Sequence, residues 1–276
     1  MEVCPPAIEI RRAAQAALRL QDPDEKMKAV AAIDPAWPLD VGLNLTAELG
    51  RPANPQLVHP RHVPSRGVGE AVGRGMLLHA LAHIEFNAIN LALDAVVRFA
   101  GLPAQFYLDW LGVAKEEAYH HGLLCQRMAD YDVVYGQYPA HDGLWQMAEK
   151  TAGSLLARLA LVPRLLEARG LDVSPAIRNK LASAGDMASA EVLDIILRDE
   201  IGHVAIGNKW FNHQCEVQGL QAIEAFEDCL QRYLAPQPRS PFNFEARAQA
   251  GFSEDELAWL MQLEVAQTGQ SGHNGA

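Results

Sequence analysis

Two glutamate–histidine pairs have the spacing that presents a carboxylate and an imidazole on the same side of a helix. Glu117 precedes His120 by three residues, and Glu200 precedes His203 by three. Three residues turn an α-helix by about 300°, so the two side chains of each pair share one face. Only these two of the ten histidines follow a glutamate at this distance. Carboxylate oxygens and imidazole nitrogens suit iron or manganese better than a metal that prefers thiolates.

Each pair follows a helical segment that carries another glutamate. Glu85 lies 32 residues before Glu117, and Glu167 lies 33 residues before Glu200. Two antiparallel helix pairs with short turns would bring such residues to one level. The pattern therefore predicts a centre of two metal ions bridged by carboxylates inside a four-helix bundle. The predicted ligands are Glu85, Glu117, His120, Glu167, Glu200 and His203.

The competing interpretation makes these residues solvated pairs on exposed helix faces. Glu85 argues against it, because it stands in the apolar string "LLHALAHIEFNAINLALDA", where an unpaired buried charge is costly. Glu200 has Ile196, Leu197 and Val204 as neighbours on its own face. The apolar surroundings favour the metal interpretation.

Glu167 is the weakest member of the set. It lies close to the apparent end of its helix, where Arg164 could pair with it on the surface. Glu149, 18 residues or five helical turns earlier, lies on the same stripe and is the substitute ligand. Pro163 removes a backbone hydrogen bond just before Glu167, and the resulting kink could turn that carboxylate inward.

Two further acidic residues are candidates for contacts behind the ligands. Metal-bound histidines usually donate their other N–H to a carboxylate. Asp199 is proposed for His120 and Glu116 for His203; the alternative is that both are charges on helix flanks. Three other histidines are expected to be satisfied in the core or at its rim: His79, His83 and His121.

The elements that position these residues are expected to be helices, and no strand pair is evident. An N-terminal part, residues 1–68, holds one or two short helices and a proline-rich arm. A bundle with a following helix occupies residues 69–235, and residues 236–276 form a second arm with a short capped helix. The long helices are expected at about 69–99, 103–130, 144–169 and 186–215. The fold class is all-α.

Composition limits the classes of function. The net charge of −11 disfavours general attraction to nucleic acid. The four cysteines have no C-x-x-C spacing, and no run of about 18 uninterrupted apolar residues suggests a membrane span. The sequence "GVGEAVGRG" lacks both the spacing and the preceding strand of a dinucleotide loop. A cytoplasmic setting is expected.

These residues resemble the ferritin-like di-iron carboxylate superfamily, whose ligand pattern they match one by one. "RDEIGH" resembles the R-D-E-x-x-H string of ribonucleotide reductase small subunits, and "LLEAR" resembles a stretch in tRNA-hydroxylating members. The chain is most similar to an uncharacterised bacterial family of ferritin-like proteins, with "AHIEFNAINLALDA" and "EVLDIILRDEIGHVAIGNKWF" among the shared strings. The resemblance implies a ferritin-like four-helix bundle with extra terminal helices and proline-rich arms.

The resemblance does not specify a reaction, because the superfamily includes storage proteins, oxidases, hydroxylases and radical generators. The leading hypothesis is an O2-activating oxidase or hydroxylase of an unknown substrate. Glu117 and Glu200 would bridge two metal ions, with iron favoured over manganese, and Glu85 and Glu167 would be terminal ligands. The expected partners are O2, a small-molecule substrate and an external electron donor; tRNA is less favoured because the chain is acidic. The alternative is iron binding or storage, or a metal-dependent structural protein without catalysis. An oligomer is compatible with either.

Overall fold

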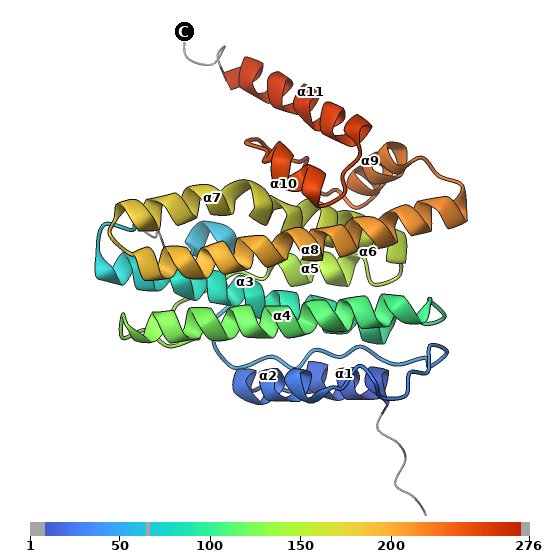
Figure 1. Cartoon of the computed structure of the whole chain (residues 1–276), viewed down its shortest axis with the longest axis horizontal. Helices are drawn as coiled ribbons and strands as arrows, with labels where there is room; N and C mark the ends of the chain where they lie inside the picture. Colours follow the sequence, from blue (N-terminus) through green and yellow to red (C-terminus); the bar gives the residue numbers. More distant parts are fainter. Residues whose placement is uncertain (1–8, 65–66, 272–276) are drawn as a thin grey trace, which may run out of the picture. The chain divides into compact units, whose positions relative to one another are not determined.

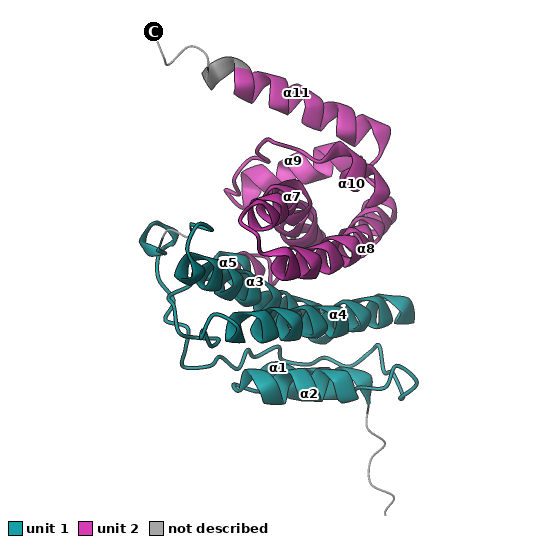
Figure 2. Cartoon of the chain, turned by 60° about the vertical axis from the view of Figure 1, so that its left-hand side comes forward, with its two compact units in different colours: residues 1–145 teal, residues 146–276 magenta. Residues whose placement is uncertain are grey.

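The computed structural model describes residues 9–64 and 67–271, and the regular secondary structure of this part of the chain is helical (Figure 1). No strand occurs within it, and a single isolated bridge joins Leu57 to Ala140. The all-α prediction is confirmed. The chain divides into two compact units, residues 1–145 and residues 146–276 (Figure 2). Parts of the predicted terminal arms, residues 1–8, 65–66 and 272–276, lie outside the described residues.

Two long helices form the centre of unit 1. Helix α3 spans Ala71–Arg98 and helix α4 spans Ala104–Ala129, close to the predicted bounds. The connection between them is short because Gly101 adopts a positive φ of 76° and Pro103 occupies the N-cap of α4. Such a short turn makes the two helices antiparallel neighbours.

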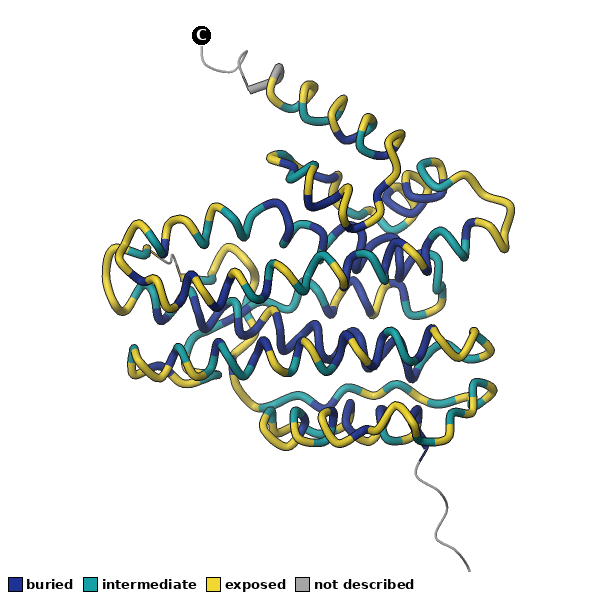
Figure 3. The backbone as a smooth tube through the Cα atoms, in the orientation of Figure 1, coloured by how far each residue is buried: buried dark blue, intermediate teal, exposed yellow. Residues whose placement is uncertain are grey.

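Most of α3 is buried from Leu78 onward (Figure 3). An 18-residue window of α3 has a mean hydropathy of 1.3, which would suit a membrane span, but 89% of that window is buried within the protein. Burial on all sides explains why α3 shows no clear apolar stripe. A polar side chain on this helix is therefore enclosed by protein.

The N-terminal segments pack on this pair of helices. Helix α1 (Ile10–Arg19) packs against α3, and helix α2 (Pro23–Ala32) packs against α4. In the described residues of the proline-rich arm, 34–64, the helical element is the 3₁₀ turn η1, Pro60–His62. Arg11 anchors the arm: the buried guanidinium donates to the carbonyls of Val96 at 2.9 Å and Leu43 at 2.7 Å. One side chain thus ties the end of α3 to the arm.

The prediction of one continuous third helix at 144–169 is wrong. The chain forms α5 (Gly143–Lys150) and α6 (Leu155–Leu161), then the π-helical turn η2 (Val162–Glu167), then α7 (Ala168–Ser183). The break before α6 follows from Ser154, whose hydroxyl accepts from the N–H of Ala157 at 3.2 Å and caps a new helix. Pro163 lies in the π-helical turn, where its missing N–H opens the α-helical hydrogen-bond pattern.

The remaining helices of unit 2 follow the predicted order. Helix α8 spans Met187–Gln218 and α9 spans Ala222–Arg232. The proline-rich excursion contains the short helix α10, Phe244–Gln249. Helix α11, Glu254–Ser271, is longer than expected, and the predicted capping box at its start is confirmed. There the N–H of Glu256 donates to Ser253 Oγ at 3.3 Å, and the N–H of Ser253 donates to Glu256 Oε2 at 2.8 Å.

Candidate metal centre

Three predicted ligands meet inside unit 1, between α3 and α4. Glu85, Glu117 and His120 are 5%, 2% and 0% exposed. His120 Nδ1 lies 3.3 Å from Glu85 Oε2 and 3.6 Å from Glu117 Oε2. One potential ligand atom from each of the three residues lies within 4.8 Å of the others. The i,i+3 spacing on α4 and the antiparallel register with α3 therefore converge two carboxylates on one imidazole.

The electrostatics of this cluster favour a cation. Burial lowers the pKa of His120, but hydrogen bonding and charge from Glu117 and Glu85 outweigh it and raise the pKa to about 10. When no metal ion is bound, the protonated imidazole of His120 is the positive charge next to these two buried carboxyl groups. Even with that proton, two carboxyl groups face a single basic group.

The donor set fits a metal ion of the iron or manganese class. Metal–oxygen and metal–nitrogen bonds of about 2.1 Å separate two donors at right angles by about 3 Å. The two nitrogen–oxygen separations around His120, 3.3 and 3.6 Å, are only slightly longer. Hard carboxylate oxygens with one imidazole nitrogen are ligands that such metals accept. Glu85, Glu117 and His120 could therefore hold a metal ion.

The second glutamate–histidine pair lies on α8 in unit 2. His203 is 1% exposed, and its Nδ1 lies 3.7 Å from Glu200 Oε1. Glu200 is partly buried. The 32-residue helix continues through both residues without a break, so they share one face as predicted. This pair repeats the α4 arrangement.

Glu167 is placed less favourably than the other candidates. It is partly buried and ends the π-helical turn η2, which packs on α8. The turn η2 approaches α8 closely at Gly207: a Cβ added there would lie 2.4 Å from Pro163 Cβ, so only glycine fits at this position. Within the described part of unit 2, Glu167 does not complete a compact group of three potential ligands with Glu200 and His203. The kink expected at Pro163 is present as a π turn.

The structure does not support the two alternatives to Glu167 as a ligand, which were Glu149 as its substitute and a surface ion pair between Glu167 and Arg164. Glu149 is exposed at the end of α5, and the break before α6 removes the helical phase that linked it to Glu167. Arg164 is not a surface partner of Glu167: it is 3% exposed and forms an ion pair with Glu256.

The two proposed supporting carboxylates remain predictions. Asp199 accepts hydrogen bonds from Arg198 at 2.7 and 3.0 Å, and Glu116 is exposed on α4. Neither observation tests their crossed pairing with His120 and His203.

The other three histidines are satisfied in the core, as predicted. His121 Nδ1 lies 2.9 Å from the carbonyl of Ala82, and the N–H of Gly136 donates to His79 Nε2 at 2.9 Å. His83 lies 2.9 Å from the hydroxyl of Tyr135. Burial lowers the pKa of His83 to about 4, with the charge of His79 adding to the effect.

Sequence reasoning missed a network of buried charges in unit 2. Arg164 pairs with Glu256, and Arg247 donates twice to Asp172, at 2.9 and 2.7 Å. All four side chains are less than a tenth exposed. Arginine next to Pro163 and arginine in the apolar context of α10 were the available signals, but only the fold shows which carboxylates face them.

Comparison with known proteins places the chain among proteins of unknown activity. The sequence matches the family described as "Protein of unknown function (DUF455)" over residues 19–258. It is 46% identical over 220 residues to an "Uncharacterized protein" of Haemophilus influenzae, covering 77% of this chain and 76% of that protein. No solved structure matches it.

Proposed function

This chain belongs to the DUF455 family of proteins of unknown function, and from that premise we propose that it is a dinuclear metal carboxylate protein of ferritin-like architecture. The metal is iron in preference to manganese. The activity is that of an O2-dependent oxidase or hydroxylase acting on a small molecule. An external electron donor completes the reaction, and the setting is cytoplasmic.

One observation carries the proposal. Two buried glutamates and a buried histidine from α3 and α4 offer ligand atoms within 4.8 Å of one another. Burying carboxylates is costly unless a cation compensates them. Such a group in a core of leucine, alanine and isoleucine is better explained by a bound ion than by stability, since apolar residues of similar volume would serve the core as well.

The repeated Glu-x-x-His pattern supports a site with two metal ions. Glu117 and His120 serve one ion, and Glu200 and His203 serve a second. Glu117 and Glu200 would be the carboxylate ligands of these two pairs, and Glu167 would be a further ligand to be tested. When two ferrous ions are bound, they supply the electrons for reducing O2 next to the substrate.

The residues of the chain have two tasks in this proposal. Glu85, Glu117 and His120 fix the ion on two long helices, which hold ligand geometry better than loops. The apolar surroundings of α3 exclude bulk water, which strengthens every charge interaction within the site and suppresses side reactions. Trp110 lies two helical turns before Glu117, and its buried indole N–H has no hydrogen-bond partner among the described residues. It is a donor available to a ligand on that face of α4.

Metal reconstitution tests the proposal directly. The full chain is loaded anaerobically with Fe²⁺ or Mn²⁺, freed of excess metal and analysed for metal content. Two metal ions per chain are expected, and Glu117→Gln should remove at least one of them. Glu149→Gln is the matched control: it removes the same charge from an exposed position and should leave the metal content unchanged.

O2 consumption by the iron-loaded protein with a chemical reductant then separates an oxidase from a binding protein. Stable storage of ferric iron without substrate-dependent O2 uptake would favour the storage alternative. Metal content equal in wild type, Glu117→Gln and Glu149→Gln would refute the site itself.

A further inference from the structure

Unit 2 contains a cavity lined by four arginines. Its volume is about 250 Å³, and it lies among the turn η2, the start of α7, the loop at 236–239 and α10. The arginines are Arg164, Arg169, Arg239 and Arg247, and Asp172 is the carboxylate among the lining residues. This concentration of positive charge is notable in a chain of net charge −11.

Two of these guanidinium groups are buried. Arg164 and Arg247 are each 3% exposed. Each is matched by one carboxylate: Glu256 for Arg164 and Asp172 for Arg247. Those two ion pairs neutralise two of the four positive charges. Arg169 Nη1 lies 3.5 Å from Asp172 Oδ2 and so shares that carboxylate with Arg247. With Arg239 included, four guanidiniums face two carboxylates, which leaves an excess of two positive charges.

The buried arginines retain donors that the protein does not use. Arg164 Nε has no hydrogen-bond partner in the described residues. Arg247 donates through Nε and Nη2, and its Nη1 donates to none of the described residues. Burying the Arg164 Nε donor without an acceptor is costly. An acceptor entering the cavity would remove that cost.

The outer arginines differ in role. Arg169 holds the proline-rich loop through the carbonyls of Arg239 at 2.6 Å and Pro241 at 2.9 Å. This fixes the backbone of the loop against α7. Arg239 is exposed and forms no ion pair within the described part of the chain, so its charge at the rim is available to a ligand.

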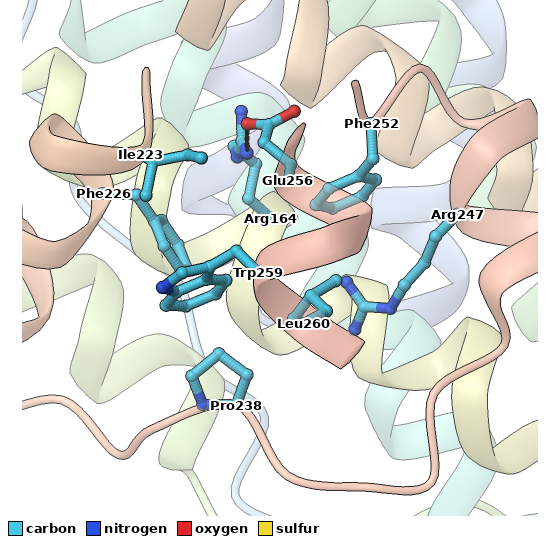
Figure 4. A pocket seen from close by; sticks show the side chains of 9 residues that line it. All are labelled: Arg164, Ile223, Phe226, Pro238, Arg247, Phe252, Glu256, Trp259 and Leu260. Atoms are coloured by element: carbon cyan, nitrogen blue, oxygen red, sulfur yellow. Dashed lines mark hydrogen bonds and ion pairs between the residues drawn. The ribbon is translucent and has the colours of Figure 1, made fainter. Parts of the chain in front are cut away.

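A narrow apolar slot adjoins the cavity. Phe226, Trp259 and Leu260 line it, and Arg164, Arg247 and Pro238 line both spaces (Figure 4). In Figure 4, Arg164 lies beside Glu256 at one side of the slot, and the guanidinium of Arg247 lies near Leu260. The slot itself has room for about one water molecule, about 10 Å³. The polar cavity is therefore the space that a ligand would occupy.

We infer that this cavity binds a small organic oxyanion, a molecule carrying a phosphate or carboxylate group. The planar guanidinium matches both groups with paired hydrogen bonds. Two buried guanidiniums with unused donors, an excess of positive charge and a cavity of suitable size occur together at this one place. The inference does not rest on the proposed metal centre, because every residue it uses lies outside the six candidate ligands.

Calorimetric titration of the metal-free full chain tests the inference. Phenyl phosphate and benzoate share one ring and differ in the anionic group, and phenol is the neutral control. Titrations are run at constant ionic strength. Saturable binding of one anion per chain, with Kd below about 1 mM and no binding of phenol, is expected. The stronger of the two anions identifies the head group that the cavity prefers.

Two arginine variants locate the binding. Arg239→Gln should weaken binding roughly fivefold, because it removes one charged donor at the rim. Arg232→Gln removes the same charge from an exposed position on α9 that does not line the cavity, and binding should be unchanged. Both residues are exposed, so both variants should fold, and thermal unfolding verifies this. Absence of saturable binding of either anion, or equal weakening by the two variants, would overturn the inference.

Discussion

Replacing Gly207 by alanine should destabilise unit 2, although alanine is the better helix former. Gly207 is buried on α8 against the π-helical turn η2. The added Cβ would lie 2.4 Å from Pro163 Cβ and 2.8 Å from its Cγ. Neither atom belongs to a flexible chain end, because the proline ring is closed onto the backbone. The turn must move by about 1 Å to restore an ordinary contact.

Two opposing effects determine how much Gly207→Ala changes the free energy of unfolding. Overpacking against a rigid neighbour costs about 3 kcal/mol, the upper part of the usual range. Alanine in place of glycine inside a helix returns about 1 kcal/mol. The net loss in the free energy of unfolding should therefore be about 2 kcal/mol.

Gly202 is the internal reference for this experiment. It lies five residues earlier on the same helix, is exposed, and would present its Cβ to open space. Gly202→Ala should therefore gain about 1 kcal/mol through helix propensity alone. The difference between the two variants, about 3 kcal/mol, isolates the steric contribution of Pro163.

Urea unfolding followed by far-ultraviolet circular dichroism measures both variants, with metal removed so that ligand binding does not contribute. If Gly207→Ala is as stable as wild type, the turn η2 can shift to accommodate the new methyl group with little loss of free energy. The reasoning that the π turn is rigidly held against α8 would then be refuted.

Three further predictions concern buried charges. Arg11→Met should cost about 3 kcal/mol in urea unfolding, because the carbonyls of Val96 and Leu43 lose a buried charged donor; a loss below about 1 kcal/mol would mean that water replaces it. Glu256→Gln should cost about 2–3 kcal/mol, since Arg164 is left with an uncompensated buried charge, and an unchanged thermal midpoint would contradict this. Burial, aided by the charge of Arg51, lowers the pKa of Lys26 to about 7, so the unfolded chain binds more protons above that pH and the stability of wild type relative to Lys26→Met should rise between pH 7 and 10. A flat difference would show that the oxygen acceptors around Lys26 keep it charged.

The sequence was informative where local rules and burial agree. Helices α3, α4 and α8 were predicted within a few residues, because each is a long, largely apolar segment with a glycine or proline close to an end. The convergence of Glu85, Glu117 and His120 followed from i,i+3 geometry and one short turn. These features depend on contacts near in sequence.

The largest error concerns the segment between α5 and α7. A single helix at 144–169 was expected because its apolar period continues past Ser154. The serine cap and the π turn at Pro163 were underestimated, and the phase assigned to Glu149 failed with them. The pairing of Arg164 with Glu256 spans 92 residues, and no local pattern could indicate it.

The buried charged groups of this protein differ in the balance of acidic and basic side chains, and this difference explains why two sites are proposed. Arg11 and Lys26 are enclosed by oxygen acceptors and serve the fold. Near His120, by contrast, two carboxyl groups face one imidazole, so the acidic groups outnumber the basic one. Around Arg247, four guanidiniums face two carboxylates and the excess is positive. A protein gains nothing in stability from either excess, so each is best understood as the complement of an ion of opposite charge: a metal cation in unit 1 and an oxyanion in unit 2.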